Sequence, residues 1–368
     1  YKDNYYNYPL RMLDLIKNMN LFSIIHAGFS FAYHRLIKLA GFSKDSSAKS
    51  WIINRYGRYL YNEFFGPYTH RVWGVEPSEL ASDFAQDRIP DRNLIEILKS
   101  LIFPSYSIKK EKTVSGRTAQ HDVDVFYYPK KGIRQLIDGM EKSYKDLGGN
   151  FNTNCSISKI IDKNDGFKID FRTNGINSII ETRKIISTIP ITSFFSCYDV
   201  NNKSIKVNLN NLKIRSLVFL YILLDRNDIL PVQWVYYHDK KFNRISEVTK
   251  FSKYCAPESK SALCIEISCF NDDEIYHSSD KEIYNHLIDE LLDLKFFNKD
   301  EIIGYCTKRE KNAYVVYMKT YREDVSKING FIEDIPNVYF AGRQGMFKYI
   351  NMDQAMQSGI NVANESLK

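Results

Sequence analysis

The stretch 337–355 reads NVYFAGRQGMFKYINMDQA, and it holds the pattern from which the fold is predicted. Residues 337–341 are typical of a buried strand, and a helix is expected from about Met352. The turn Gly342-Arg-Gln-Gly345 has two glycines, which let the backbone approach another molecule closely. In open α/β sheets a ligand binds beyond the carboxyl end of such a strand, and the next helix favours an anionic or electron-accepting group. A plain β-turn around a buried Arg343 is the alternative interpretation.

The segment before this unit predicts short strands and one clear helix. The helix covers residues 132–147, where the apolar residues share one stripe and Gly148-Gly149 marks the stop. Strands are expected at residues 150–161, 167–173 and 184–188.

The middle of the chain predicts an antiparallel sheet followed by a helix. The β-branched or alternating runs are residues 204–225, 232–238, 245–251 and 262–270. A capping box, Ser279-x-x-Glu282, then opens a helix that reaches about Leu294.

The first hundred residues predict helices. Residues 10–42 are the most apolar stretch, but Asn18, His26 and Arg35 interrupt it, so it lacks the roughly 18 apolar residues of a transmembrane helix. The period indicates two amphipathic helices there and a third at residues 48–65, within a largely helical region of residues 9–107. Packing of their apolar faces into a core is favoured over contact with a membrane.

Length and composition predict a folded chain of two or three sub-domains. The 368 residues are 44% hydrophobic and 26% charged, which excludes a disordered tail or a small disulfide scaffold. Lys and Arg number 51 against 44 Asp and Glu, giving a formal charge of +7 without a long basic run. This mild excess does not indicate nucleic-acid binding, and it suits an anionic small ligand or an acidic membrane surface.

The cysteines and histidines do not form a metal motif. The six cysteines make no C-x-x-C pair and stand mostly in apolar runs, which predicts buried thiols in a reducing compartment, the cytoplasm. The seven histidines have no H-x-x-x-H spacing, so no structural metal is expected.

Four ordered motifs give the chain a resemblance to a known family. Residues 337–355 resemble the C-terminal flavin signature of flavin amine oxidases, protoporphyrinogen oxidase-like proteins and UDP-galactopyranose mutases. Residues 51–61 (WIINRYGRYLY) and 64–80 (FFGPYTHRVWGVEPSEL), with Arg88-Ile-Pro90, resemble the helical-domain motif of this group. Residues 128–136 (YPKKGIRQL) and 185–190 (IISTIP) follow in the family's order.

The resemblance implies a mixed α/β fold, with a Rossmann-like FAD-binding domain of discontinuous segments, an antiparallel-sheet substrate domain and a helical sub-domain. The expected boundaries are 1–126 for the helical cap, 127–195 and 301–368 for the FAD-binding segments, and 196–300 for the sheet. The family's G-x-G-x-x-G loop, which holds the FAD pyrophosphate, matches none of the 17 glycines. We expect that first βαβ unit, of about 30 or more residues, to lie before Tyr1.

The resemblance implies FAD as the cofactor and assigns residues to it. The backbone of Ile157 is expected at the adenine end, and an ordinary core position is compatible with that role. The turn from Thr188 to Pro190 is expected near the dinucleotide. The residues expected along the pyrophosphate, ribityl chain and isoalloxazine ring are Gly342, Arg343 and Met352.

The expected substrate residues come from two regions that face one another in family members. They are Tyr68, Trp73 and Arg88 from the helical region, and Tyr314, Tyr317 and Tyr349 from the last segments. Any one aromatic residue is more often core than site in a chain with 26 tyrosines and 23 phenylalanines. Arg88 matches an arginine that grips a nucleotide diphosphate in the sugar mutases. A surface ion pair with Asp87 or Asp91 is its alternative role.

The predicted function is FAD-dependent oxidation, in which hydride passes from a small-molecule substrate to flavin N5 and the electrons go on to oxygen or another acceptor. No catalytic residue is assigned, because the candidates near the motifs are Tyr, Lys and Arg. The alternative is a redox-neutral mutase acting on a nucleotide sugar, which Arg88-Ile-Pro90 and Tyr349 favour. A third interpretation is a non-catalytic flavoprotein or peripheral membrane protein that uses residues 10–42. Substrate, electron acceptor and oligomeric state stay open.

Overall fold

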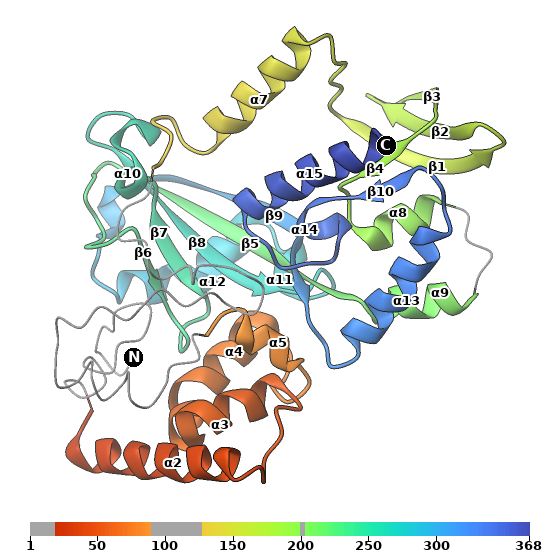
Figure 1. Cartoon of the computed structure of the whole chain (residues 1–368). Coiled ribbons are helices and arrows are strands. Elements are labelled where there is room, and N and C mark those ends of the chain that lie inside the picture. Colours follow the sequence, from red (N-terminus) through yellow and green to blue (C-terminus); the bar gives the residue numbers. More distant parts are fainter. Residues whose placement is uncertain (1–18, 90–126, 199–202) are drawn as a thin grey trace. The chain divides into compact units, whose positions relative to one another are not determined.

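The computed structural model describes residues 19–89, 127–198 and 203–368 and divides into two compact units (Figure 1). Unit 1 falls within Tyr1–Gly132 and Leu217–Arg309, and unit 2 within Ile133–Ser216 and Glu310–Lys368. Both combine helices with sheets, which confirms the predicted mixed fold class.

The described N-terminal part of unit 1 is helical, as predicted, and the rest of residues 9–107 lies outside the described residues. Gly57, with φ +81°, kinks α3 (Ala48–Leu60). A Cβ on Gly57 would lie 2.7 Å from the backbone of Phe31 in α2 (Leu21–Leu39). Only glycine allows this close approach of α2 and α3. The elements are α2 (Leu21–Leu39), α3 (Ala48–Leu60), the π-helical turn η1 (Tyr61–Phe65), α4 (Gly66–Trp73) and α5 (Ser82–Gln86).

The carboxylate of Asp45 ties α2 to α3. It accepts hydrogen bonds from Asn54 Nδ2 at 2.8 Å and Arg55 Nη1 at 2.9 Å, and Lys38 Nζ lies 3.1 Å away. Burial raises the pKa of Asp45, but the hydrogen bonds from Asn54, Arg55 and Lys38 outweigh it and leave the pKa below its ordinary value. The carboxylate is therefore stabilised in its charged form.

The larger sheet has five strands in the order β6-β7-β8-β5-β9. Its aliphatic face packs on α12 (Asp280–Leu292), where Val218, Leu220 and Ile222 of β5 are fully buried together with Ile283 and Leu287. The predicted capping box of this helix is confirmed between Ser279 and Glu282. The strands are β5 (Lys213–Leu224), β6 (Trp234–Tyr236), β7 (Arg244–Glu247), β8 (Ser261–Cys269) and β9 (Ile302–Val316), and the short helices are α10 (Val248–Phe251), α11 (Glu274–His277), η2 (Lys253–Cys255) and η3 (Lys299–Glu301).

Two predicted strands of this region were too long. Residues 204–225 begin as helix α9 (Lys203–Asn211), because Ile205, Leu209 and Leu212 recur at helical spacing and are buried. Residues 245–251 stop being a strand at Glu247, whose buried carboxylate accepts hydrogen bonds from the backbone of Ile229 and Leu230.

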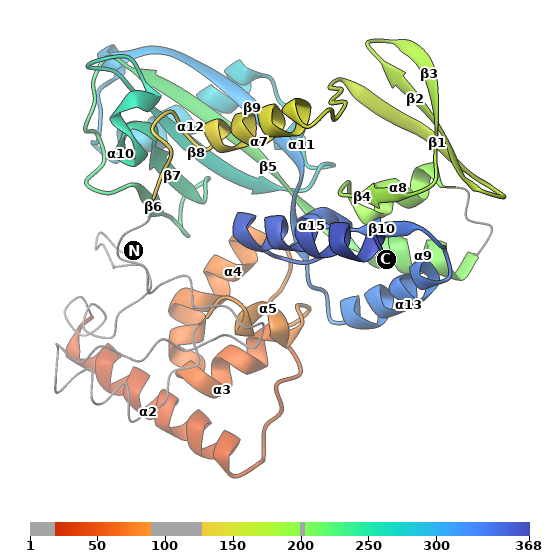
Figure 2. The same cartoon turned by 45° about the horizontal axis from the view of Figure 1, so that its top comes forward.

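Unit 2 contains a three-stranded antiparallel sheet, β1-β2-β3, and a two-stranded parallel sheet, β10-β4 (Figure 2). Its core is aromatic, since Phe194 and Phe195 of α8 contact the rings of Phe340 and Phe331. The predicted helix at 132–147 is confirmed as α7 (Arg134–Asp146), but none of its residues is buried. The other elements are β1 (Cys155–Lys163), β2 (Gly166–Thr173), β3 (Ile176–Thr182), β4 (Ile185–Ser187), α8 (Ile191–Cys197), α13 (Tyr321–Glu333), β10 (Val338–Phe340), α14 (Gly342–Gly345) and α15 (Met352–Ser366).

Two interpretations of burial were wrong. Helix α2 has no buried residue, so its apolar face does not pack into a core. Cys155 and Cys306 are exposed, whereas Cys264 and Cys269 are buried as predicted.

We predict that Asp45→Asn lowers the free energy of unfolding by about 1–2 kcal/mol at pH 7, because it removes charged hydrogen bonds from a carboxylate that is mostly shielded from water. The pKa of Asp45 in the folded protein is lower than its ordinary value of 3.8. The stability that its carboxylate contributes is therefore present above pH 3.8 and is lost as the pH falls through the pKa of the folded state. Urea titrations at neutral and acid pH should show the difference from wild type shrinking below pH 3.8.

The control is Asp138→Asn, which loses only an exposed i,i+4 pair with Arg134 and should change stability by less than about 0.5 kcal/mol. A difference at neutral pH no larger than that of the control would contradict the role of Asp45.

Candidate functional site

The carboxyl ends of two parallel strands meet in unit 2. Phe340 of β10 pairs with Ser187 of β4, and Ala341 N donates a hydrogen bond to the Ser187 carbonyl at 3.0 Å. A Cβ on Gly345 would lie only 2.8 Å from that same carbonyl and 3.4 Å from Thr188 Cα. The structure therefore brings the turn after β4, with Thr188, against the turn after β10, with Gly342.

Gly342 lies beside open space. Its φ is +76°, its N–H donates to Ser358 Oγ at 2.9 Å, and a Cβ built on it meets nothing within 4 Å. A larger residue would have room here but would adopt a left-handed backbone conformation that costs roughly 1–2 kcal/mol. Glycine thus keeps the backbone accessible at this turn.

Arg343 is directed into the protein. Its Nε and Nη2 donate to the Ile350 carbonyl at 2.9 and 2.7 Å, and its Nη1 donates to the Ala313 carbonyl at 3.3 Å. The guanidinium carbon also lies 4.7 Å from the ring centre of Tyr349 and 5.4 Å from that of Tyr314. Arg343 therefore fixes the loop before α15 to the end of β9, and a direct contact with FAD stays a prediction.

Of the three C-terminal tyrosines expected at the substrate, Tyr314 and Tyr349 lie beside this arginine, and Tyr317 contacts Tyr349. Tyr314 and Tyr349 have ring centres 5.6 Å apart. Tyr317 is buried, accepts a hydrogen bond from Tyr349 N at 2.8 Å and stacks on Tyr321 at 4.2 Å. Tyr317 thus acts through the position of Tyr349, while Tyr314 and Tyr349 are half-buried and can line a site.

Two buried polar atoms beside these turns lack a hydrogen-bond partner within the described chain. They are Ser187 Oγ, at the end of β4, and Gln344 Oε1, within the glycine turn. Unpaired buried polar atoms are costly, so these two atoms point to a partner outside the described residues.

The remaining predicted cofactor residues are accessible. Thr188 is exposed, and Pro190 is the half-buried N-cap of α8. Met352, the first residue of α15, is 50% exposed. Ile157 lies at a register irregularity of β1, is about one-third exposed, and its carbonyl accepts a hydrogen bond from Cys197 Sγ at 3.4 Å. Ile157 is therefore not an ordinary core residue.

In unit 1, Arg88 packs on aromatic rings. Its guanidinium carbon lies 4.2 Å from the ring centre of Phe84 and 4.7 Å from that of Trp73, and Nη1 donates to the Phe84 carbonyl at 2.9 Å. Trp73 is buried edge-on against Phe84. Asp91, one of the suggested ion-pair partners, lies outside the described residues.

Unit 1 also holds a polar cluster that the sequence analysis missed. Arg244 Nε donates to the buried Glu266 carboxylate at 2.8 Å, and Arg244 Nη1 lies 3.3 Å from Tyr236 Oη. Tyr68, a predicted substrate residue, contacts the Tyr236 ring edge-on at 6.2 Å. Burial and the neighbouring Glu266 raise the pKa of Cys264 to about 12.

The cluster lies on the face of the large sheet opposite the aliphatic one. Tyr236, Arg244 and Glu266 are cross-strand neighbours on β6, β7 and β8. Polar residues at every second position of a buried strand, as in Cys264-x-Glu266-x-Ser268, are the signal that could have revealed it.

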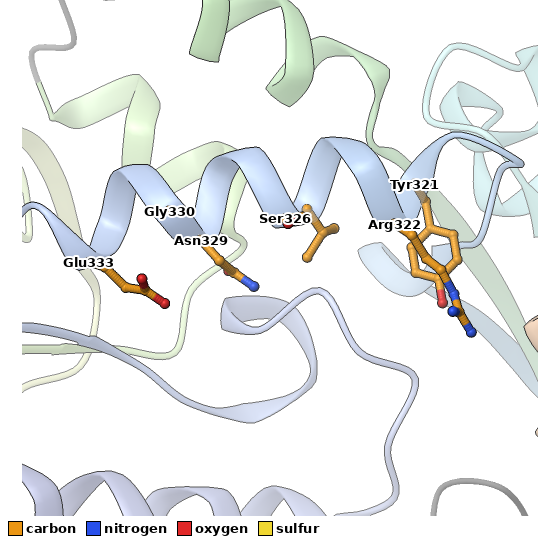
Figure 3. Close-up of a pocket in the computed structure, with 7 residues that line it drawn as sticks. Tyr321, Arg322, Ser326, Asn329, Gly330 and Glu333 are labelled. Atoms are coloured by element: carbon orange, nitrogen blue, oxygen red, sulfur yellow. The ribbon is translucent and has the colours of Figure 1, made fainter.

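A shallow cavity of about 470 Å³ runs along α13 and contains none of the predicted site residues (Figure 3). A single helix lines it, with Tyr321, Arg322, Val325, Ser326, Asn329, Gly330 and Glu333. Within residues 19–89, 127–198 and 203–368, no three His, Cys, Asp or Glu side chains are grouped as for a metal ion.

We predict that Gly345→Ala lowers the free energy of unfolding by about 1–3 kcal/mol, because its Cβ would be forced against the Ser187 carbonyl at 2.8 Å. Urea unfolding measures the effect. Gly359→Ala is the control, since it adds a Cβ in open space within α15 and should be neutral or stabilising by up to about 1 kcal/mol. Equal stability of the two variants would show that the turns are not in close contact.

Comparison with known proteins places the fold. No protein-family model and no curated protein matches the chain. A reduced UDP-galactopyranose mutase has a similar structure, with a TM-score of 0.78 and 15% identity over 96% of this chain and 73% of that one. A putative protoporphyrinogen oxidase from Exiguobacterium sp. 255-15 has a TM-score of 0.60 and 11% identity, over 86% of this chain and 65% of that one. A putrescine oxidase double mutant has a TM-score of 0.60 and 12% identity, over 95% of this chain and 76% of that one. The predicted resemblance is thus confirmed at the level of the fold, which this chain shares with a UDP-galactopyranose mutase and with oxidoreductases.

Proposed function

We propose that the protein is an FAD-dependent oxidoreductase that takes hydride from a small-molecule substrate. The observation that carries the proposal is the meeting of two turns, Ser187–Pro190 and Gly342–Gly345, at the carboxyl ends of parallel strands β4 and β10. That edge of a parallel sheet is where α/β folds bind their ligands. The fold itself is shared with putrescine oxidase and a putative protoporphyrinogen oxidase.

The residues at this edge fit a dinucleotide. Gly342 leaves open space where the backbone can be approached, and Ser187 Oγ and Gln344 Oε1 are buried without a partner in the described chain. Gly342, Arg343 and Met352 are the proposed neighbours of the pyrophosphate, ribityl chain and isoalloxazine ring. The turn from Thr188 to Pro190 is proposed to pass near the dinucleotide, and the backbone of Ile157 to contact its adenine end.

Flavin, when bound, accepts hydride at N5 and gains negative charge at N1 and O2. The amino end of α15, where Asn351 and Gln354 form a capping box, supplies a positive dipole end suited to that charge. Arg343 keeps this end in place through the Ile350 carbonyl. No step requires a side-chain base, in agreement with the aromatic character of Tyr314 and Tyr349.

The proposed substrate residues of unit 2 are Tyr314, Tyr317 and Tyr349. The substrate roles of Tyr68, Trp73 and Arg88, which belong to unit 1, stay predictions. Tyr314 and Tyr349 would wall the site with their rings, and Tyr317 would orient Tyr349 through its backbone N–H. Such aromatic walls favour an apolar or cationic substrate.

A nucleotide-sugar mutase is the second candidate. One observation favours it, because the TM-score of 0.78 to the mutase exceeds the 0.60 found for the two oxidases. The stacking of Arg88 on Trp73 and Phe84 speaks for a packing role instead of a grip on a diphosphate.

We predict that the protein expressed from its complete coding sequence purifies with a flavin absorption band, and that Gly342→Val abolishes flavin retention while the far-ultraviolet circular dichroism persists. The branched side chain would fill the open space at the turn. Gly175→Val is the matched control, because Gly175 also has a positive φ and open space but lies in the β2–β3 turn. Full flavin occupancy in Gly342→Val, or equal loss in the control, would place the cofactor elsewhere.

Binding of a UDP-sugar distinguishes the oxidoreductase from the nucleotide-sugar mutase. For the oxidoreductase we expect flavin-loaded wild type and Arg88→Ala alike to bind UDP-sugars weakly or not at all by calorimetry. For the mutase, Arg88→Ala would remove a charged contact to the diphosphate and lower the affinity roughly ten- to a hundred-fold. Arg55→Ala controls for general destabilisation of the same helical region, since it removes a stack on Trp51 at 4.2 Å and the hydrogen bond to Asp45. Micromolar binding that only Arg88→Ala destroys would make the mutase the first choice.

A further inference from the structure

Helix α2 exposes a continuous apolar face. None of its residues is buried, and its large apolar side chains recur every three to four positions, which puts them on one side of the helix. Monomeric proteins seldom leave so large an apolar surface in water without a binding role. Seven exposed residues of α2, together with Phe42 just beyond its end, are 49% to 85% accessible and are called the α2 stripe: Leu21, Phe22, Ile25, Phe29, Tyr33, Leu36, Leu39 and Phe42.

The other side of α2 is held by α3, so the direction of the stripe is fixed within unit 1. Ser30 Oγ accepts a hydrogen bond from Tyr59 N at 3.1 Å, and the His26 ring lies 4.7 Å from the Tyr59 ring. The missing Cβ of Gly57 lets the Phe31 backbone approach α3. The stripe is thus presented on a folded support and not on a loose helix.

The charges around the stripe suit an anionic surface. No exposed residue between 21 and 42 is charged, and α2 contains no acidic residue. Within residues 19–49 the only acidic residue is Asp45, which pairs with Lys38 and Arg55. Of the other basic residues, Arg35 is half-buried, and Lys44 and Lys49 are exposed. An apolar face flanked by basic residues is the pattern of helices that lie in a membrane interface.

The composition of the stripe favours lipid over a protein partner. Protein interfaces carry about one hydrogen bond per 100–200 Å², whereas Tyr33 is the only member of the stripe with a polar group. Aromatic residues mixed with leucine are suited to the boundary between head groups and acyl chains. No helix among the described residues is long and apolar enough to cross a membrane. At about 1.5 Å per residue, the 19 residues of α2 extend over nearly 30 Å.

We propose that α2 docks the protein on the surface of an anionic lipid bilayer, with the α2 stripe at the boundary of head groups and acyl chains. Lys44 and Lys49, which are exposed, contribute the attraction to acidic head groups. This role is independent of the chemistry proposed for unit 2.

The test is co-sedimentation of the full chain with vesicles of phosphatidylcholine, with and without phosphatidylserine. We expect binding to the phosphatidylserine vesicles that weakens with salt, and at least about tenfold weaker partitioning for the double variant Phe22→Ser and Phe29→Ser. The control is Ile176→Ser with Ile179→Ser, which removes comparable exposed apolar surface from β3 and should change partitioning by less than about twofold. Circular dichroism checks that both variants are folded.

A second measurement uses Phe29→Trp, which keeps an aromatic ring in the stripe. Its binding should persist, and brominated lipids should quench its emission more than that of wild type. Absence of vesicle binding by wild type, equal loss in the control, or no added quenching would overturn the proposal. The proposal would also be overturned if wild type did not bind vesicles but self-associated, and the Phe22→Ser and Phe29→Ser variant did not self-associate. That result would identify the stripe as an interface between copies of the chain.

Discussion

The candidate site in unit 2 depends on the contact between Gly345 and the carbonyl of Ser187, where a Cβ would approach to 2.8 Å. Because β4 and β10 are parallel, this contact brings their carboxyl ends to one edge and places two turns together. Arg343 completes the arrangement by joining the carbonyls of Ile350 and Ala313. A small residue where the strands meet and an inward arginine beside it thus leave the Gly342 backbone open to a ligand.

The large sheet has an aliphatic face that packs into the core and an opposite face that carries a polar cluster. Its aliphatic face is closed by α12, with Leu220 and Leu287 fully buried. Its opposite face pairs Arg244 with the buried Glu266, and the two charges offset each other's loss of hydration. Tyr68 lies at the border of this cluster through Tyr236, so the predicted substrate residue belongs to a larger polar group.

Local patterns made the elements predictable. The βα unit of residues 337–355, helix α7 and the capping box of α12 were all predicted because strand composition, helical period and caps involve neighbouring residues. Strand β3 was missed although Asn174-Gly175, both with positive φ, is a strong hairpin signal. Helix α9 was predicted as a strand because, in a short run, a few apolar residues can fit both the helical and the strand spacing.

Amphipathic patterns occur in α12, α7 and α2, yet only in α12 are residues buried. The sequence determined which residues share a helix face, because that follows from 3.6 residues per turn. Only the tertiary structure decided which faces are covered, because burial depends on elements far away in the chain. The same holds for Arg343, which the sequence placed at a ligand turn. Its hydrogen bond to Ala313, 30 residues earlier, exists only once β9 and the turn have come together.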